Sequence, residues 1–399
     1  MISTFPSEAS HTFNSTTINA IGCLLSFILA ILIERVVIPR VLLISKRKRL
    51  YDLPDKRKSH KNPIPRLAGI TFLPVIMLSF LPLLGLQAAV MDNPATIYSA
   101  SFIMRLSFVM CGCMTLVLLG IKDDLIGVRY SHKFVIQIIA ALLLIASNTY
   151  INNLYGLLGI HELPYYIGLP LTLVLVVYII NSINLIDGVD GLAATLTEIA
   201  TLGLGVFLFI EGSCSYACLA FAVSGMLFTF TYYNTHSKRK IFMGDTGSLT
   251  LGYMVAFLAI HYSMAGATPI SGMHTTPPIV IAWSVLFVPM FDTIRVMCVR
   301  ASKRMPVFSP DRNHIHHKLL DLGYSHRKVT CTLGGCALFI VLFNILLQGI
   351  LNINLLLVLN LTIGILFNLY LNKKQKGIVS LKYRKDTPVK DRTINTINA

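Results

Sequence analysis

The stretch LTLVLVVYIINSINLIDGVDGLAATLTEIATLGLGVFLFI, residues 171–210, decides how this chain folds. Two apolar runs of about 20 residues, each long enough to cross a bilayer as a helix, flank a short polar segment. That segment contains Asn184, Asp187 and Asp190, and a glycine follows each aspartate. The pattern predicts two membrane-spanning helices joined by an acidic turn, and the reason for that acidity has to come from the rest of the chain.

The whole chain has the composition of a membrane protein. Of its 399 residues, 54% are hydrophobic and only 13% are charged, whereas soluble domains carry about 25% charged residues. Lipid offers no partner to an open strand edge, so helices are the expected spanning elements. We therefore expect an all-α polytopic protein with about eleven transmembrane helices, over residues 18–44, 67–90, 98–120, 133–149, 166–183, 192–210, 215–233, 247–263, 277–300, 330–348 and 351–371.

Lys and Arg are distributed unevenly between the two sets of loops. With Lys133 and Arg300 at helix ends included, 30 of the 34 basic residues lie in alternate loops and the C-terminal tail, and the opposite loops and the N-terminus contain none. The positive-inside rule then places the N-terminus outside and the C-terminus in the cytoplasm. We expect three parts, a short external N-terminus, a single transmembrane domain and a basic cytoplasmic tail: residues 1–17, 18–371 and 372–399.

This topology, with attraction to anionic membrane lipid, accounts for the net charge of +16, so no nucleic-acid partner is indicated. Residues 1–17 have no basic segment at their start, which argues against a cleaved signal peptide. The eight cysteines lie mostly inside expected helices without CxxC spacing. We interpret them as small apolar residues and not as zinc or redox ligands.

The unusual polar clusters all fall in the expected cytoplasmic loops. A carboxylate costs about 2.5–3.5 kcal/mol at a helix centre on insertion scales, and topology does not require acidic residues at helix ends. Convergence on one cytoplasmic site explains why they are there. The loops read YDLPDKRKSHKNPIPRLAG (51–69), GIKDDLIGV (120–128), NLIDGVDGLA (184–193), NTHSKRKIFMGDTGSLTLG (234–252) and SPDRNHIHHKLLDLG (309–323).

Adjacent carboxylates occur at Asp123 and Asp124. They repel each other unless a cation or a proton lies between them. A helix-capping role would explain one of them but not its neighbour. The other reading is a site for Mg²⁺ and phosphate, because Mg²⁺ prefers hard oxygen ligands and usually shares its coordination shell with substrate phosphates.

In the opening stretch Asn181, Asn184, Asp187 and Asp190 recur every third residue, which makes successive members helical neighbours. The glycines loosen the backbone, so both carboxylates can turn toward a ligand. A plain polar turn would explain the glycines and one aspartate but not the asparagines.

The segment FMGDTGSLTLG (242–252) places Asp245 between glycines at the start of an apolar helix. Exposed N–H groups there favour an anion, so Asp245 is suited to a metal while residues 246–248 meet a phosphate. A simple helix cap is the alternative. The segment lacks the GxxxxGK[ST] pattern of a Walker A loop.

The fifth loop contributes three histidines: His314, His316 and His317. Zinc needs three or four ligands, and no cysteine lies nearby on the cytoplasmic side. Imidazoles beside Arg312 and Lys318 are better suited to facing a phosphate and carrying protons. A solvated polar loop is the alternative. The first loop adds further basic residues: Lys58, His60 and Arg66.

Taken in order, PIPRxxG, DD, NxxNxxDGxDGLA, FMGDxGS and HxHH resemble the motifs of the polyprenyl-phosphate N-acetylhexosamine-1-phosphate transferase family. The spaced HxHH form resembles the branch that loads UDP-N-acetylglucosamine onto undecaprenyl phosphate. The peptidoglycan branch usually has contiguous histidines and a lysine where this chain has Gly127. The first-loop motif commonly ends in GG, whereas this chain has Ala68 and Gly69.

The resemblance implies transfer of N-acetylglucosamine-1-phosphate from UDP-N-acetylglucosamine to undecaprenyl phosphate with release of UMP. This would be the first step of a cell-envelope polysaccharide, at the cytoplasmic face of a bacterial inner membrane. Mg²⁺ is the implied cofactor, with Mn²⁺ as an alternative. Another UDP-N-acetylhexosamine or UDP-MurNAc-pentapeptide as substrate, a phospho-enzyme intermediate and a homodimer all stay open.

The resemblance also implies roles for individual residues. Asp245 and Asp187 would hold the metal, and Asp123 would act as base. The position of Phe242 beside Asp245 suits stacking on uracil, and packing in the core is the alternative for this side chain. The implied catalytic residues are Asp123, Asp124, Asp187, His314, His316 and His317. The implied substrate-binding residues are Asn184, Asp190, Asn234, Phe242, Ser248, Arg312, Lys133, Lys58, His60 and Arg66.

Three other classes of protein share some of these features. A cation-coupled transporter carries intramembrane acids, but near the midplane and often in internal repeats. A CDP-alcohol phosphotransferase needs an arginine that DGVDGLAA lacks. A membrane scaffold would not need five polar clusters on one face.

Overall fold

The computed structural model describes residues 7–52, 63–90, 99–236, 239–264, 277–306 and 313–386. The described chain is all-α apart from two short hairpins, which confirms the predicted class. A helix occupies each expected apolar run, and one short extra helix, α10, carries the histidines. The helices are α1 (Ser7–Arg47), α2 (Gly69–Val90), α3 (Ala100–Ile126), α4 (Tyr130–Ala146), α5 (Tyr165–Ile186), α6 (Leu192–Ile210), α7 (Cys214–Thr235), α8 (Gly244–Met264), α9 (Pro278–Ser302), α10 (Ile315–Asp321), α11 (His326–Leu347) and α12 (Ile353–Asp386).

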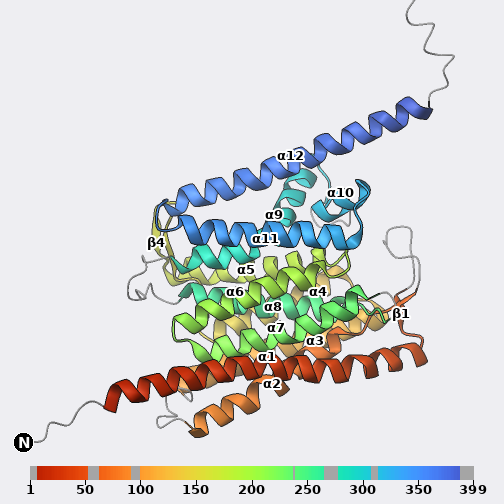
Figure 1. Ribbon diagram of the computed structural model, residues 1–399. Helices are drawn as coiled ribbons and strands as arrows, with labels where there is room; N and C mark the ends of the chain where they lie inside the picture. The colour runs from red at the N-terminus through yellow and green to blue at the C-terminus, as the bar shows by residue number, and fades with distance from the viewer. Residues whose placement is uncertain are drawn as a thin grey trace, which may run out of the picture.

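Two antiparallel hairpins mark the two ends of the helix bundle. Strand β1 (Tyr51–Asp52) pairs with β2 (Ile64–Pro65), and β3 (Asn153–Leu157) pairs with β4 (Ile160–Glu162). In Figure 1 the helices lie side by side, with β1 and α10 at one end and β4 at the other. The polar loops singled out in the sequence belong to the end that carries β1 and α10.

Within the described residues, nine helices are long and apolar enough to cross a membrane. The two remaining expected runs are α4, which has 17 residues, and α8. Helix α8 is buried along nearly its whole length and packs against α2, α3, α5, α6 and α9. Because it meets protein instead of lipid, it accommodates glycine, serine and threonine at lower hydropathy. The count of eleven is therefore not confirmed, and the orientation stays a prediction.

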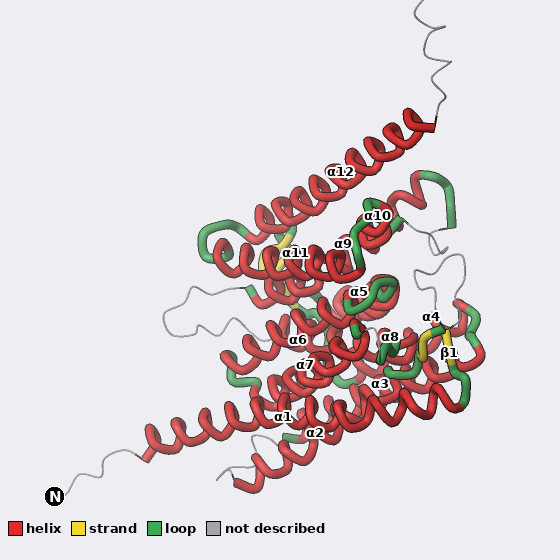
Figure 2. The backbone as a smooth tube through the Cα atoms, turned by 45° about the vertical axis from the view of Figure 1, so that its right-hand side comes forward, coloured by secondary structure: helices red, strands yellow, loops and turns green. Residues whose placement is uncertain are grey.

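The remaining helices surround α8 in an order that leaves α1 and α12 on opposite sides of the bundle (Figure 2). Helix α1 packs along α7, and α7 packs along α6. Large apolar side chains such as Leu32 and Leu366 are exposed on the two outer helices. This surface is typical of helices that face lipid.

Several helix ends differ from those expected. Helix α3 continues to Ile126, so the two adjacent aspartates lie in its last turn and not in a loop. Helix α1 begins at Ser7 and α12 continues to Asp386, beyond the expected domain boundaries. Hydropathy locates an apolar run, whereas the backbone hydrogen bonding of a helix also extends through polar residues that find partners. The division into three parts stays a prediction.

Candidate active site

Asp124 binds the N-terminus of α8. Its carboxylate accepts hydrogen bonds from the backbone N–H groups of Asp245 and Thr246 at 2.8 and 3.0 Å, from the Thr246 hydroxyl at 2.7 Å, and from Arg66 Nε at 2.9 Å. The N–H groups predicted to meet a substrate phosphate are therefore bonded to a carboxylate of the protein itself. Asp124 thus caps the N-terminus of a helix that is distant in the sequence. Its negative charge also interacts favourably with the positive end of the helix dipole.

Close backbone packing makes this contact between α3 and α8 possible. Gly244 has φ +69°, and a Cβ there would lie 2.4 Å from Asp124 Oδ2. A Cβ on Gly120 would lie 2.3 Å from Thr246 Cα. Only glycine permits both approaches, so the two helix ends form one rigid unit.

Lys133 joins two carboxylates that come from different helices. Its Nζ lies 2.6 Å from Asp123 Oδ2 and 2.5 Å from Asp245 Oδ2. Asp245 Oδ1 accepts a hydrogen bond from Asn184 Nδ2 at 3.3 Å and lies 3.8 Å from Arg66 Nη2. The structure therefore brings together five residues predicted from four separate loops.

Asp187 lies beside this cluster at the C-terminal end of α5. Burial, with Asp245 and Asp124 nearby, raises the pKa of Asp187 well above its ordinary value. No donor of a described residue hydrogen-bonds to its carboxylate. The described residues also contain no group of three or more His, Cys, Asp or Glu placed to hold a metal ion. Two neighbouring carboxylates still fit Mg²⁺, which binds through one or two carboxylates plus substrate phosphates.

Asp190 belongs to a second cluster on the other side of the same turn. It pairs with Lys240 and with His326, whose Nδ1 lies 2.8 Å from Asp190 Oδ2. The Thr330 hydroxyl donates to the Asp190 backbone oxygen at 2.8 Å. Burial acts to raise the pKa of Asp190, but the hydrogen bonds from His326 and Lys240 outweigh it and hold the pKa below its ordinary value. Asp190 thereby ties the turn to α11.

His314 is held by a buried carboxylate of α9. Its Nδ1 lies 2.9 Å from Asp292 Oδ2, and Asp292 Oδ1 accepts from Ile315 N at 3.0 Å. Arg295 Nη2 completes the group by donating to Asp292 Oδ1 at 2.6 Å and to the backbone oxygen of Asn313 at 2.5 Å. The start of α10 is therefore fixed to α9.

His316 is buried against the acidic turn between α5 and α6. Its ring lies against Gly188 of the acidic turn and 4.2 Å from the His317 ring, centroid to centroid. Within the described residues neither ring nitrogen of this buried side chain has a hydrogen-bond partner. Burial and the neighbouring His317 lower the pKa of His316 to about 3, so the ring is neutral at physiological pH.

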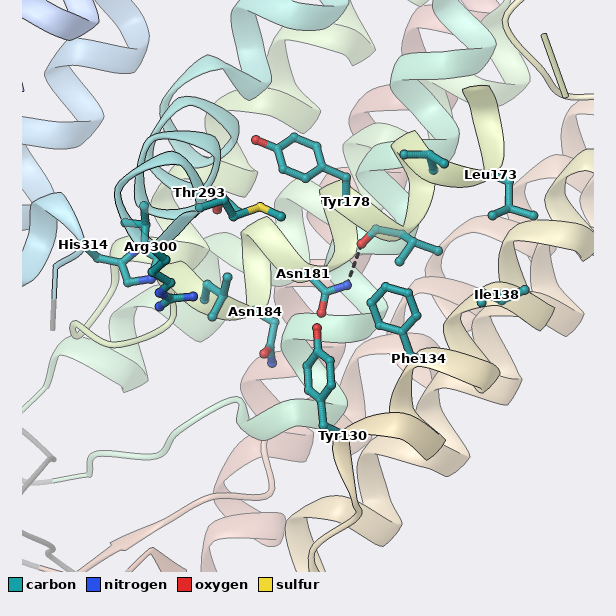
Figure 3. A pocket seen from close by; sticks show the side chains of 15 residues that line it. Tyr130, Phe134, Ile138, Leu173, Tyr178, Asn181, Asn184, Thr293, Arg300 and His314 are labelled. Carbon is teal, nitrogen blue, oxygen red and sulfur yellow. Dashed lines mark hydrogen bonds between the residues drawn. The ribbon is translucent and has the colours of Figure 1, made fainter. Parts of the chain in front are cut away.

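An apolar pocket of about 230 Å³ adjoins these groups, between α4, α5 and α9. Aromatic and aliphatic side chains such as Phe134 and Ile138 form most of its wall (Figure 3). Asn184, Arg300 and His314 add polar groups to its lining, with Arg300 and His314 at the left of Figure 3 and Asn184 nearer its centre. Because Asn184 also contacts Asp245, the pocket and the acidic cluster share a wall.

Three predicted substrate-binding residues make contacts within the protein. Asn234 is buried, accepts from Gly191 N and donates to Ile241 O at 2.9 Å. Ser248 is buried and accepts from Asn184 Nδ2 at 2.8 Å. The Phe242 backbone pairs with Pro65 and Ala68, and Lys240 Nζ lies 5.3 Å from the Phe242 ring centroid. Their substrate roles stay predictions. Lys58, His60 and Arg312 lie outside the described residues.

Comparison with known proteins agrees with this arrangement. A family model described as glycosyl transferase family 4 matches residues 106–263. A probable undecaprenyl-phosphate N-acetylglucosaminyl 1-phosphate transferase of Bacillus subtilis (strain 168) is 32% identical over 309 residues, which are 77% of this chain and 80% of the relative. The chain belongs to the polyprenyl-phosphate N-acetylhexosamine-1-phosphate transferase family. The predicted family is thereby confirmed.

Two further relatives of this transferase indicate its branch. A decaprenyl-phosphate N-acetylglucosaminephosphotransferase of Mycobacterium tuberculosis (strain ATCC 25618 / H37Rv) is 30% identical, over 72% of the transferase and 73% of the relative. An undecaprenyl-phosphate alpha-N-acetylglucosaminyl 1-phosphate transferase of Escherichia coli (strain K12) is 28% identical, over 71% and 73%. The transferase is thus nearest the N-acetylglucosamine branch, and its apolar helices make it a multi-pass membrane protein.

Sequence reasoning missed four residues that hold the site of the transferase together: Lys240, Asp292, Arg295 and His326. The sequence did contain a signal for Asp292. A carboxylate inside the apolar run of α9 is energetically costly unless a cation or a hydrogen-bond donor pairs with it, so its presence indicates such a partner. Lys240 and His326 each lie directly beside other basic residues, so nothing in the sequence distinguishes them from their neighbours.

Proposed function

We propose that this protein transfers N-acetylglucosamine 1-phosphate from UDP-N-acetylglucosamine to undecaprenyl phosphate at the cytoplasmic face of a bacterial inner membrane. The observation that carries the proposal is the pair of carboxylates bridged by Lys133, which lies beside an apolar pocket between membrane helices. A reaction between a prenyl phosphate and a nucleotide sugar needs both a charged site and an apolar groove. The activities for which the relatives are named support this choice of substrates.

The pocket between α4, α5 and α9 is suited to the first part of the prenyl chain. Its wall is mainly apolar, while Asn184, Arg300 and His314 give one side a polar character. A prenyl phosphate bound with its chain in the pocket would place its phosphate at this polar side. The acidic cluster is then within reach, because Asn184 contacts Asp245 directly.

The reaction is a displacement at phosphorus. An oxygen of the lipid phosphate attacks the phosphorus that carries the sugar, and a P–O bond forms while the bond from that phosphorus to the UMP oxygen breaks. UMP leaves, and the product is a lipid diphosphate sugar. Two anions must meet, so neutralisation of their charge by Lys133 and Arg66 and alignment by the histidines matter most. Asp123 accepts the proton when the lipid phosphate arrives protonated.

Asp245 and Asp187 are the residues that would hold Mg²⁺, or Mn²⁺ in its place. The metal would neutralise the diphosphate of the nucleotide sugar. Asp187 suits this role because its carboxylate faces other acidic groups without a hydrogen-bond donor among the described residues. His316 offers unpartnered ring nitrogens to the same substrate phosphates.

Membranes containing the protein test the reaction directly. Radiolabelled UDP-N-acetylglucosamine, undecaprenyl phosphate and Mg²⁺ should yield a butanol-extractable lipid together with UMP. A panel of UDP-N-acetylhexosamines and UDP-MurNAc-pentapeptide then identifies the sugar, and the lipid product shows whether the reaction can begin a cell-envelope polysaccharide. Absence of a lipid product with every sugar would refute the proposal.

The metal role is tested by Asp245→Asn, with Asp321→Asn as the matched control. Asp245 lies in the acidic cluster, whereas Asp321 is exposed at the end of α10. We expect a loss of transfer of at least about 100-fold for the first variant, because one group that binds the reacting phosphates is removed. The second should stay near wild type, and EDTA should abolish activity in the wild type. Near-normal turnover of Asp245→Asn would contradict the assignment.

A further inference from the structure

A second polar pocket lies at the end of the bundle opposite the acidic cluster. It has a volume of about 180 Å³ and lies where the start of α3 meets the turn between α6 and α7. Its polar lining consists chiefly of Arg105, Ser99, Ser101, Ser213 and Ser215. Arg105 precedes Asp123 by 18 residues in α3, which corresponds to about 27 Å along a helix. The pocket is therefore separate from the candidate active site.

Among the residues that the structure describes, none is an anionic partner of the Arg105 guanidinium. One of its terminal nitrogens lies 3.5 Å from the Tyr216 hydroxyl, and its Nε is buried with no hydrogen-bond partner among the described residues. Glu211, the acidic residue of this turn, forms no ion pair with Arg105 among the described residues, and its Oε2 is buried without a hydrogen-bond partner there. A buried N–H without an acceptor is unfavourable. An anion bound at this position would supply the acceptor and would also pair with the positive charge of Arg105.

Arg105 is also out of place in the charge distribution of the chain. Thirty of the 34 Lys and Arg residues belong, in the sequence, to the loops and helix ends expected on the cytoplasmic side or to the C-terminal tail. Of the other four, Arg35 and Arg40 lie in the last third of α1, and Arg295 contacts Asn313 beside the histidines. Arg105 alone lies at the opposite end, against the positive-inside rule. Topology gives no reason for a cation there.

The remaining wall of the pocket also favours negative charge. Helices α3 and α7 both begin there, with Ser99 and Ser213 as their N-cap residues. The Ser99 hydroxyl accepts from Phe102 N at 3.2 Å, whereas the Ser213 side chain makes no capping hydrogen bond. Helix N-termini attract anions, and serine hydroxyls donate hydrogen bonds.

We propose that this pocket binds a phosphate group, with Arg105 as counter-ion and the serine hydroxyls as additional donors. The planar fork of an arginine matches the oxygens of a phosphate, and donors from two further sides suit a tetrahedral anion better than a planar carboxylate. The phosphate can come from the headgroup of an anionic phospholipid or from free inorganic phosphate. This site does not depend on the proposed transfer reaction.

The test uses the full-length protein in a non-anionic detergent and native mass spectrometry. One arm titrates short-chain phosphatidylglycerol, and the other titrates inorganic phosphate. Ser213→Asp places a carboxylate beside Arg105 while keeping a good N-cap, and Ser213→Asn is its neutral matched control. Arg105→Gln is the second variant. Sugar-phosphate transfer is measured in parallel, and we expect it to be unchanged in all variants.

We expect the wild type and Ser213→Asn to retain one more phosphate-bearing molecule than Ser213→Asp and Arg105→Gln. The affinity of that molecule should fall at least about tenfold in both, because a charge-assisted contact is lost. A difference confined to phosphatidylglycerol identifies a lipid headgroup as the ligand, and one confined to inorganic phosphate identifies the free ion. A difference in both arms shows that the phosphate group suffices. Equal retention by all four proteins in both arms would overturn the proposal.

Discussion

The ammonium group of Lys133 lies between carboxylates that approach from α3 and α8. Asp123 is buried, and its other oxygen accepts from Val128 N at 2.7 Å. Without the lysine, two carboxylates would face each other with less compensating positive charge, which is unfavourable at short range. In the proposed reaction the same lysine would face the two substrate phosphates, so its charge would serve both the protein and that reaction.

Replacing Lys133 by Met should therefore abolish most of the transfer. We expect a loss of at least about 100-fold, comparable with the removal of one donor that stabilises a transition state. Lys122→Met is the matched control, because Lys122 immediately precedes Asp123 in α3 but its side chain is exposed, so this variant should retain near-normal turnover. The radiolabelled lipid assay measures both. Retention of more than about a tenth of the activity by Lys133→Met would contradict this role.

The ion pairs of Asp190 should make a pH-dependent contribution to the stability of the folded protein. Its pKa is lowered in the folded protein by His326 and Lys240 against the effect of burial, so the unfolded chain binds the proton more tightly. The stabilisation is complete above the unfolded pKa, near 3.9, and is lost as the pH falls through the folded pKa. At pH 7, Asp190→Asn should be about 1–3 kcal/mol less stable than the wild type.

Thermal unfolding of the two proteins in detergent at a series of pH values checks this prediction. The difference in midpoint should be full at neutral pH and should shrink below about pH 4, where Asp190 takes up a proton first in the unfolded chain and, at lower pH, in the folded protein. A difference that grows on acidification would show that the ion pairs of Asp190 do not stabilise the fold.

At the scale of elements, α10 is a short helix held by its neighbours. Asp292 fixes its start to α9, and Lys318 Nζ donates to Asn368 and Asn372 of α12 at 2.7 Å each. Burial, with Arg295 nearby, lowers the pKa of Lys318 to about 8. A helix of 7 residues is not stable alone, so the positions of His316 and His317 depend on these two attachments.

The double variant Asn368→Leu with Asn372→Leu should loosen α10 without touching the acidic cluster. It removes the two acceptors of the Lys318 ammonium, which should lower the stability of the attachment of α10 to α12 by about 1–3 kcal/mol. Hydrogen exchange of the backbone amides in α10 should accelerate, while that of α8 stays slow. Leu369→Ala is the control, because Leu369 is exposed on the same helix. Unchanged exchange in α10 would mean that α12 does not hold it.

Sequence and structure agree best on which loops converge. The polar residues of separate loops were predicted to form one site, and Asn184 does contact Asp245. The sequence could not show that Asp124 binds the start of α8 or that Asp292 binds His314, because nothing near these residues indicates their direct partners. Such pairings depend on helix packing, which hydropathy and spacing do not encode.

At the scale of the whole molecule, the polar loops occupy one end of the bundle, and the hairpin of β3 and β4 occupies the other (Figure 1). Basic residues follow the same division, which predicts an external N-terminus and a cytoplasmic C-terminus. Buried α8 and the 17-residue α4 both begin at the polar end. If both cross the membrane with the nine apolar helices, the two termini lie on opposite sides.

Fusions to the C-terminus test this orientation in a bacterial cell. Green fluorescent protein fused after Ala399 should fluoresce, whereas alkaline phosphatase at the same position should stay inactive, because only the periplasm oxidises its disulfides. An N-terminal alkaline phosphatase fusion exported ahead of α1 should give the opposite result. Active phosphatase at the C-terminus would reverse the topology and would place the acidic cluster outside the cell.

The glycine packing between α3 and α8 limits how the enzyme could be engineered. Side chains cannot be enlarged at Gly120 or Gly244 without moving Asp124 or Thr246, so a library of variants that randomises this wall would consist mostly of inactive proteins. Altered sugar selectivity would be sought on the wall that α10 forms, because α10 is attached to α9 and α12 through the side chains of Asp292 and Lys318. The two walls differ in how freely they can be redesigned.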